Sequence, residues 1–175
     1  MRRAVLSLVG VLLLAGCSDP QTGPLEPHWD RDACERCRMV LSDRTYAAQI
    51  RYLPQGKKRP LTLWFDDFGC ASLWLDEQSW RNNPGIEIWV TDYQSGKWVD
   101  ARIASYVVGK VTPMAYGLGA SPNPVEGGLD YVQAKQHIRD VEQRFNIRQA
   151  HLLEQAKNHA AEAPVLPPIE KKGGN

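Results

Sequence analysis

The chain has 175 residues, 43% of them apolar, and its 21 basic and 20 acidic residues give a formal net charge of +1. This length suits one compact domain or two small subdomains. The balanced charge argues against a nucleic-acid-binding protein, so we expect no nucleic acid among its partners. The basic cluster Lys57-Lys58-Arg59 is most simply a solvated turn.

The chain begins like a bacterial leader peptide. Arg2-Arg3 provides a basic start, residues 4–14 are apolar, and Ala15-Gly16 supplies the small residues of a cleavage site. A spanning helix needs about 20 residues, so this apolar run is too short to be one. With Cys17 directly behind the small pair, the segment resembles a lipobox, whose cysteine is lipidated and becomes the mature N-terminus. We expect a leader over residues 1–16; the alternative is an ordinary signal peptide beside a chance cysteine.

The residues that follow bear on where the anchored protein lives. A lipid on Cys17 would hold the protein on the periplasmic side of a bacterial membrane. Ser18 stands where an aspartate is associated with inner-membrane retention, although Asp19 comes next, and we favour the outer membrane over the inner. Three prolines, a glycine and several charges between residues 18 and 32 predict a flexible tether over residues 17–32.

The first half of the domain is predicted to have the order β-β-α-β. Two short strands are predicted over residues 46–52 and 61–65, joined by a hairpin loop. Asp66-Asp67 can cap a helix that runs to about Trp80, and residues 86–91 alternate as a strand.

The second half is predicted to contain further strands and a second helix. Residues 98–100 and 104–108 are strand candidates, and the glycine-rich segment 114–120 is either a strand or a loop of close approach. A helix is predicted over residues 129–145, followed by a polar, partly disordered tail over residues 147–175. The alanine-rich part of this tail, up to Ala163, is a candidate for further helix. The inward-facing positions expected on this helix are Val132, Ile138, Val141 and Phe145.

Three cysteines remain besides the one in the lipobox: Cys34, Cys37 and Cys70. Thiols in an oxidising compartment tend to be paired, reactive or bound to a metal. Because the number is odd, at least one of these cysteines needs an explanation other than a structural disulfide.

The motif that carries the chemistry is the hexapeptide from Cys34 to Met39, which has the pattern CxxCxM. If the chain over residues 37–40 is extended, Cys37 and Met39 present a thiolate and a thioether on one face. Cys34 would then reach the same point only through a turn. Such soft sulfur donors favour Cu(I), whereas a thioether is a poor ligand for zinc.

The CxxC spacing also fits other roles. It could be a redox pair, a zinc site or an inert Cys34–Cys37 disulfide. His28 is the histidine nearest to these cysteines and could complete a coordination shell. Cys70, at the start of the first predicted helix, could be reactive or simply a small core residue.

Met114 is a further candidate thioether ligand. A methionine is more often a core residue than a ligand. The chain has three methionines including the initiator, however, and the other two, Met39 and Met114, both lie beside function-like motifs. The small residues that follow Met114 would let a ligand or backbone approach closely.

Several short motifs in a fixed order are more specific together than any one alone. They are Asp32-Ala33-Cys34 through Cys37-Arg38-Met39, Ser42-Asp43, Tyr46-Ala47-Ala48-Gln49-Ile50, Phe65-Asp66-Asp67-Phe68-Gly69-Cys70, Val90-Thr91-Asp92-Tyr93, Gly96-Lys97-Trp98-Val99-Asp100-Ala101 and Thr112-Pro113-Met114. From the lipobox to about Phe145, the chain thereby resembles the NosL-type copper lipoproteins associated with nitrous oxide reductase maturation.

The resemblance implies a periplasmic lipoprotein without turnover of its own. It would bind one Cu(I) and deliver it to nitrous oxide reductase. The resemblance does not identify the protein that donates the copper. The implied fold is α+β, with two ββαβ-type halves over residues 33–92 and 93–146 that resemble a domain of organomercurial lyase. The family pattern would have glycine between the second cysteine and its methionine, where Arg38 adds a positive charge.

The competing hypothesis is an enzyme that uses the cysteines as nucleophiles, either a disulfide oxidoreductase or a lyase of the organomercurial type. Likeness of fold does not carry function. A lyase would also need a carboxylate near the thiols, and the sequence alone does not place Asp66 or Asp67 there. A third hypothesis is a structural lipoprotein with an inert disulfide.

Overall fold

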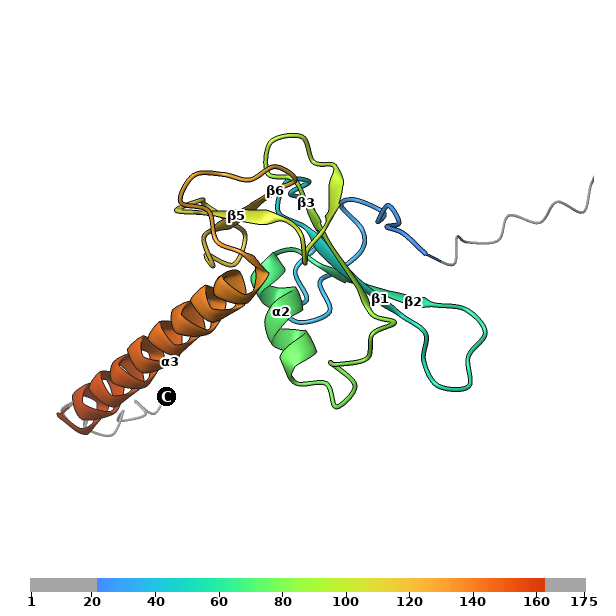
Figure 1. Ribbon diagram of the computed structural model, residues 1–175. Helices are drawn as coiled ribbons and strands as arrows, with labels where there is room; N and C mark the ends of the chain where they lie inside the picture. The colour runs from blue at the N-terminus through green and yellow to red at the C-terminus, as the bar shows by residue number, and fades with distance from the viewer. Residues whose placement is uncertain (1–21, 163–175) are drawn as a thin grey trace, which may run out of the picture.

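The computed structural model describes residues 22–162, which form the α+β fold that we predicted (Figure 1). Cys17 and the predicted leader lie outside these residues. Within 22–162, neither helix combines the length and apolar character needed to cross a bilayer. The elements in chain order are β1 (Ala48–Tyr52), β2 (Leu61–Phe65), α2 (Phe68–Asp76), β3 (Glu87–Thr91), β4 (Trp98–Asp100), β5 (Ser105–Val108), β6 (Leu118–Ser121) and α3 (Tyr131–Glu162).

The first four strands form one antiparallel sheet in the order β2-β1-β3-β4. The predicted order β-β-α-β is confirmed for β1, β2, α2 and β3. β4 pairs with β3, Val99 opposite Val90, and so joins the first sheet rather than the second half in which we had placed it. The core side of β1 is formed by small and branched residues, with Ala48 and Ile50 fully buried.

Helix α2 begins where Asp67 caps it and ends earlier than predicted. The Asp67 carboxylate accepts a hydrogen bond from the Gly69 N–H at 2.8 Å, which satisfies a free donor of the first turn. The helix ends at Asp76, and Trp80 stacks on Tyr52 with ring centroids 4.1 Å apart. The chain has to leave the helix to bring the Trp80 ring over this strand.

A second layer is made of the β5–β6 hairpin and the first part of α3. Phe68 of α2 stacks on Tyr106 of β5, with ring centroids 4.8 Å apart. The segment 114–120 combines both alternatives that we considered, because β6 begins at Leu118 and the residues before it form a loop.

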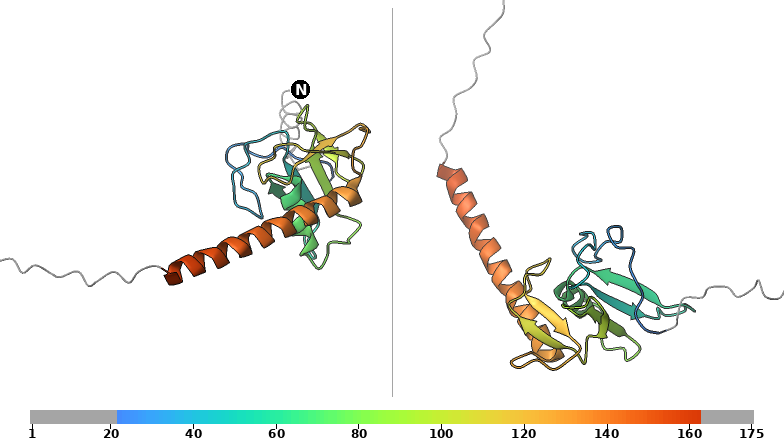
Figure 2. Two further views of the ribbon diagram at one scale, coloured as in Figure 1. Left: turned by 90° about the vertical axis from the view of Figure 1, so that its left-hand side faces the viewer. Right: turned by 90° about the horizontal axis from the view of Figure 1, so that it is seen from above.

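Helix α3 contacts the body along its first half, up to Glu142 and Phe145. Ile138 and Val141 are buried as predicted, and the Phe145 ring, although 38% exposed, faces the buried Tyr116 ring with centroids 6.3 Å apart. Val132 is 71% exposed, so this position was predicted wrongly. The helix continues to Glu162 and projects away from the body in each view (Figures 1 and 2). The described part of the predicted tail therefore continues α3, in agreement with the helix considered for it up to Ala163.

The described part of the predicted tether is held against the first sheet. The amide of buried Gln49 accepts from the Leu25 N–H and donates to the Leu25 carbonyl oxygen, both at 3.0 Å. The Gly23 N–H donates to Glu87 at 2.9 Å. Buried polar groups of the sheet need partners, and this segment supplies them, so it is not the flexible linker that its composition predicts.

Candidate metal centre

Three cysteines and one aspartate converge beside the start of α2. One ligand atom from each of Cys34, Cys37, Asp66 and Cys70 lies within 4.8 Å of all the others. The three cysteines are free thiols. Cys37 is half-buried and the other three residues are buried. The donor set could hold a metal ion, and it combines soft sulfur with one carboxylate oxygen.

Cys34 and Cys37 come from a tight turn. Ala33 and Val40 form an antiparallel bridge that closes it. Within it, the Cys34 N–H donates to the Met39 carbonyl oxygen at 2.8 Å, and the Arg38 N–H donates to the Cys34 carbonyl oxygen at 3.0 Å. Arg38 has φ of +65°.

The turn overturns one premise of the sequence analysis. Because Arg38 lies in the left-handed region, residues 37–40 are not an extended segment, and Cys37 and Met39 do not share a face by strand alternation. Cys34 does reach the site through a turn, which was the condition stated for it.

Asp66 and Cys70 enter from the junction of β2 and α2. Asp66 directly follows β2, and Cys70 lies four residues later in the first turn of the helix. The Cys37 thiol donates to Asp66 Oδ2 at 3.2 Å. Asp66 Oδ1 is buried and has no hydrogen-bond partner among the described residues. An orphaned buried acceptor is costly, and a bound cation would satisfy it.

The cluster favours one thiolate in the absence of metal. The Cys70 thiol donates to Cys34, and this hydrogen bond lowers the pKa of Cys34 to about 7. The same hydrogen bond, together with burial, raises the pKa of Cys70. Burial raises the pKa of Cys37 to about 12. Cys34 is therefore partly ionised at neutral pH, and an entering cation would release the remaining thiol protons.

A polar network ties the cysteine turn to α3. Arg36, between the two cysteines, donates to the Tyr116 hydroxyl at 3.0 Å and to Glu142 at 2.7 Å. The Tyr116 hydroxyl donates to the same carboxylate at 2.7 Å. The Tyr116 ring lies so close to the first turn of α2 that a Cβ at Gly69 would be 2.1 Å from it. The contacts of Arg36 and Tyr116 therefore hold the cysteine turn against the first turn of α2, which contains Cys70.

Three further residues were predicted as possible ligands, and none of them belongs to the cluster of three cysteines and Asp66. Met39 is 51% exposed, at the end of the turn. Met114 is half-buried, and its N–H donates to Asp67, the residue after Asp66, at 3.2 Å. His28 is exposed beside Asp32 and outside the cluster. Ligand roles for the two methionines stay predictions.

Two parts of the site were not predicted from the sequence. Asp66 was considered as a helix cap and as the carboxylate that a lyase would need near the thiols, but not as a metal ligand; it lies outside α2, so helical spacing does not place it beside Cys70. The contacts of Arg36 with Tyr116 and Glu142 join residues 80 and 106 positions apart, and no local pattern marks them.

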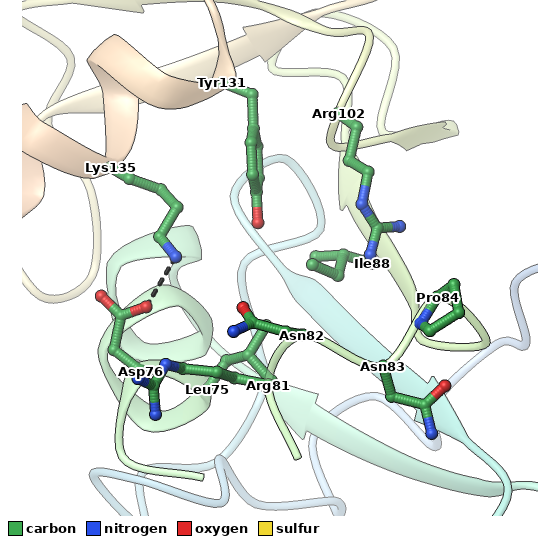
Figure 3. A pocket seen from close by; sticks show the side chains of 10 residues that line it. All are labelled: Leu75, Asp76, Arg81, Asn82, Asn83, Pro84, Ile88, Arg102, Tyr131 and Lys135. Atoms are coloured by element: carbon green, nitrogen blue, oxygen red, sulfur yellow. Dashed lines mark hydrogen bonds and ion pairs between the residues drawn. The ribbon is translucent and has the colours of Figure 1, made fainter. Parts of the chain in front are cut away.

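A separate cavity of about 500 Å³ lies at the other end of α2 (Figure 3). It is lined by Arg81, Arg102 and Lys135 but by no cysteine, and Lys135 pairs with Asp76 at 2.6 Å. This cavity is therefore distinct from the cysteine cluster.

Comparisons of the chain with protein-family models, with curated proteins and with solved structures give no match. The structure itself shows three thiols and a carboxylate that could hold a metal ion. A statement about the identity of the metal or about its destination is therefore a proposal.

Proposed function

We propose that this protein is a periplasmic, lipid-anchored Cu(I) carrier that delivers copper for the maturation of nitrous oxide reductase. The observation that carries the proposal is the convergence of Cys34, Cys37 and Cys70 with Asp66 within 4.8 Å. The acceptor protein and the lipid on Cys17 come from the sequence resemblance.

The donor set favours Cu(I) as cargo. Thiolates are soft donors that select soft metals, and Cu(I) is stable in an all-sulfur shell of two or three ligands. Cys34 and Cys70 are fully buried, which excludes the water that Cu(II) or Mg²⁺ would keep. Zinc would need Asp66 as a fourth ligand, whereas Cu(I) would not.

The burial of the cluster is uneven in a way that suits transfer. Cys37 is its one half-buried member, so a ligand from an acceptor would reach the metal from that side. Met39 ends the same turn and is exposed, and a thioether exchanges readily. A carrier needs such an open side, while a structural site is closed all round.

A deletion strain tests the role directly. Cells without this protein, grown under copper limitation, should make nitrous oxide reductase polypeptide that lacks copper. The full chain should restore its copper content, and a chain with Cys34→Ser, Cys37→Ser and Cys70→Ser should not. Normal copper content of the reductase in the deletion strain would exclude the role.

One observation favours a second candidate function, an organomercurial lyase. Asp66 lies 3.2 Å from the Cys37 sulfur, so the carboxylate that such chemistry needs is present. Two thiolates would bind the mercury of an organomercurial cation. The carbon–mercury bond would break with its electron pair on carbon, a proton relayed through Asp66 would complete the hydrocarbon, and Hg²⁺ would stay on the thiolates. Release of benzene from a phenylmercury salt would support this function. If no benzene is released, the copper carrier is the one remaining candidate.

A further inference from the structure

The β1–β2 hairpin and its flanks carry only positive charge. Between Asp43 and Asp66 the chain has five cations and no acidic residue. Three of them, Lys57, Lys58 and Arg59, are exposed at the hairpin tip. Within the described chain, none of these three side chains takes part in an ion pair.

Two exposed leucines flank the charged tip. Leu53 follows β1 and is 56% exposed, and Leu61 begins β2 and is 44% exposed. Lys57, Lys58 and Arg59 line a shallow cavity together with Leu61. The hairpin tip therefore joins cationic heads to apolar side chains on one surface, a combination that suits the boundary between lipid headgroups and acyl chains.

The tip lies beside the place where the chain leads toward Cys17. Thr22 lines one cavity together with Leu53 and Pro60. The next residue, Gly23, is fixed to the sheet by its hydrogen bond to Glu87. Thr22 is five positions after Cys17 in the chain, so an extended chain allows at most about 18 Å between them.

We infer that the hairpin tip, defined as Lys57, Lys58, Arg59, Leu53 and Leu61, is a membrane-contacting surface that binds anionic phospholipid headgroups. The inference rests on the proposed lipidation of Cys17. A short anchor beside the tip keeps the three cations near the membrane surface, where anionic lipids attract lysine and arginine over roughly 10 Å.

This contact gives the anchored protein a fixed orientation. The hairpin and the projecting part of α3 leave the body on different sides (Figures 1 and 2). With the hairpin on the lipid, the exposed part of α3 extends away from it. Lys157, exposed on this part of α3, is therefore a matched control for Lys57 and Lys58.

The test measures lysine reactivity in the full lipidated protein. The protein is extracted from cell membranes and reconstituted into vesicles of phosphatidylglycerol and phosphatidylethanolamine, or of phosphatidylcholine alone. A water-soluble acylating reagent modifies exposed lysines, and mass spectrometry of peptides gives each rate. Lys57 and Lys58 should react at least about threefold more slowly on the anionic vesicles, and 1 M salt should remove the difference. Lys157 should react equally on both.

The outcomes separate this inference from the proposals on which it rests. Equal rates for Lys57 and Lys58 on both vesicles would overturn the membrane contact and leave a solvated turn or a site for an acidic protein. An unmodified Cys17 in the peptide spectra would overturn the anchor and the inference together. Neither result depends on whether the protein carries copper.

Discussion

The sulfur of Cys37 lies 3.2 Å from Oδ2 of Asp66, and this contact joins the cysteine turn to the junction of β2 and α2. Asp66 is buried, and its other oxygen has no partner among the described residues. The carboxylate therefore holds the Cys37 thiol at the open side of the cluster. A metal ion that displaces the thiol proton would lie within reach of this carboxylate as well.

Replacing Asp66 separates copper from zinc. Asp66→Asn keeps the shape of the side chain and removes its charge. Cu(I) affinity should fall by about tenfold or less, because the sulfurs do the binding, while zinc affinity should fall more because zinc loses its fourth ligand. Chelator competition measures both metals, with Asp76→Asn at the far end of α2 as the control. Equal losses for the two metals would contradict this division of roles.

The thiols should titrate in two well-separated steps. The metal-free protein should gain thiolate absorbance at 240 nm with a midpoint near the Cys34 pKa of about 7, below the ordinary value of 9.0. Cys37, whose burial raises its pKa to about 12, should not contribute in that range. The lowered pKa of Cys34 stabilises the fold above pH 9, and this contribution is lost as the pH falls through 7. Cys34→Ser should remove the first step, and a wild-type curve without it would refute the hydrogen bond from Cys70.

The two arginines of the cysteine turn should differ in their effect on stability. Arg36 donates to both Tyr116 and Glu142, and Arg36→Ala should lower the free energy of unfolding by about 2 kcal/mol because it removes a hydrogen bond to the Tyr116 hydroxyl and a charge-assisted one to the half-buried Glu142 carboxylate. Arg38 pairs only with Glu35 and its side chain is 70% exposed. Arg38→Ala should therefore change the free energy of unfolding by less than about 0.5 kcal/mol. Urea unfolding of the metal-free proteins measures both, and similar losses would mean that the network does not hold the turn.

The two methionines can be tested by substitutions that keep volume. Met114→Leu should cost less than about 1.5 kcal/mol of stability in the metal-free protein. If the thioether is a ligand, as the sequence predicts, the same substitution weakens Cu(I) binding substantially. Met39→Leu should also weaken Cu(I) binding. Cu(I) affinity that survives Met114→Leu would make Met114 a packing residue.

Local patterns predicted much of the fold and less of the site. The strand over residues 61–65 and the Asp67 cap follow from alternation and capping, which act over a few residues. The place of β4 in the first sheet depends on pairing between strands, which a one-dimensional pattern does not contain. The CxxC motif identified the right turn, but strand geometry was assumed for it because nothing in the residue types signalled the positive φ of Arg38.

The central claim is that Cys34, Cys37 and Cys70 bind Cu(I) together. Anaerobic competition of the full mature chain against a Cu(I) chelator tests it most directly. The wild type should take up one Cu(I), and each single cysteine-to-serine variant should lose affinity by at least about a hundredfold, with Cys34→Ser no milder than Cys37→Ser. Copper uptake that is unchanged in the triple serine variant, or a wild type that binds zinc but no Cu(I), would contradict the claim.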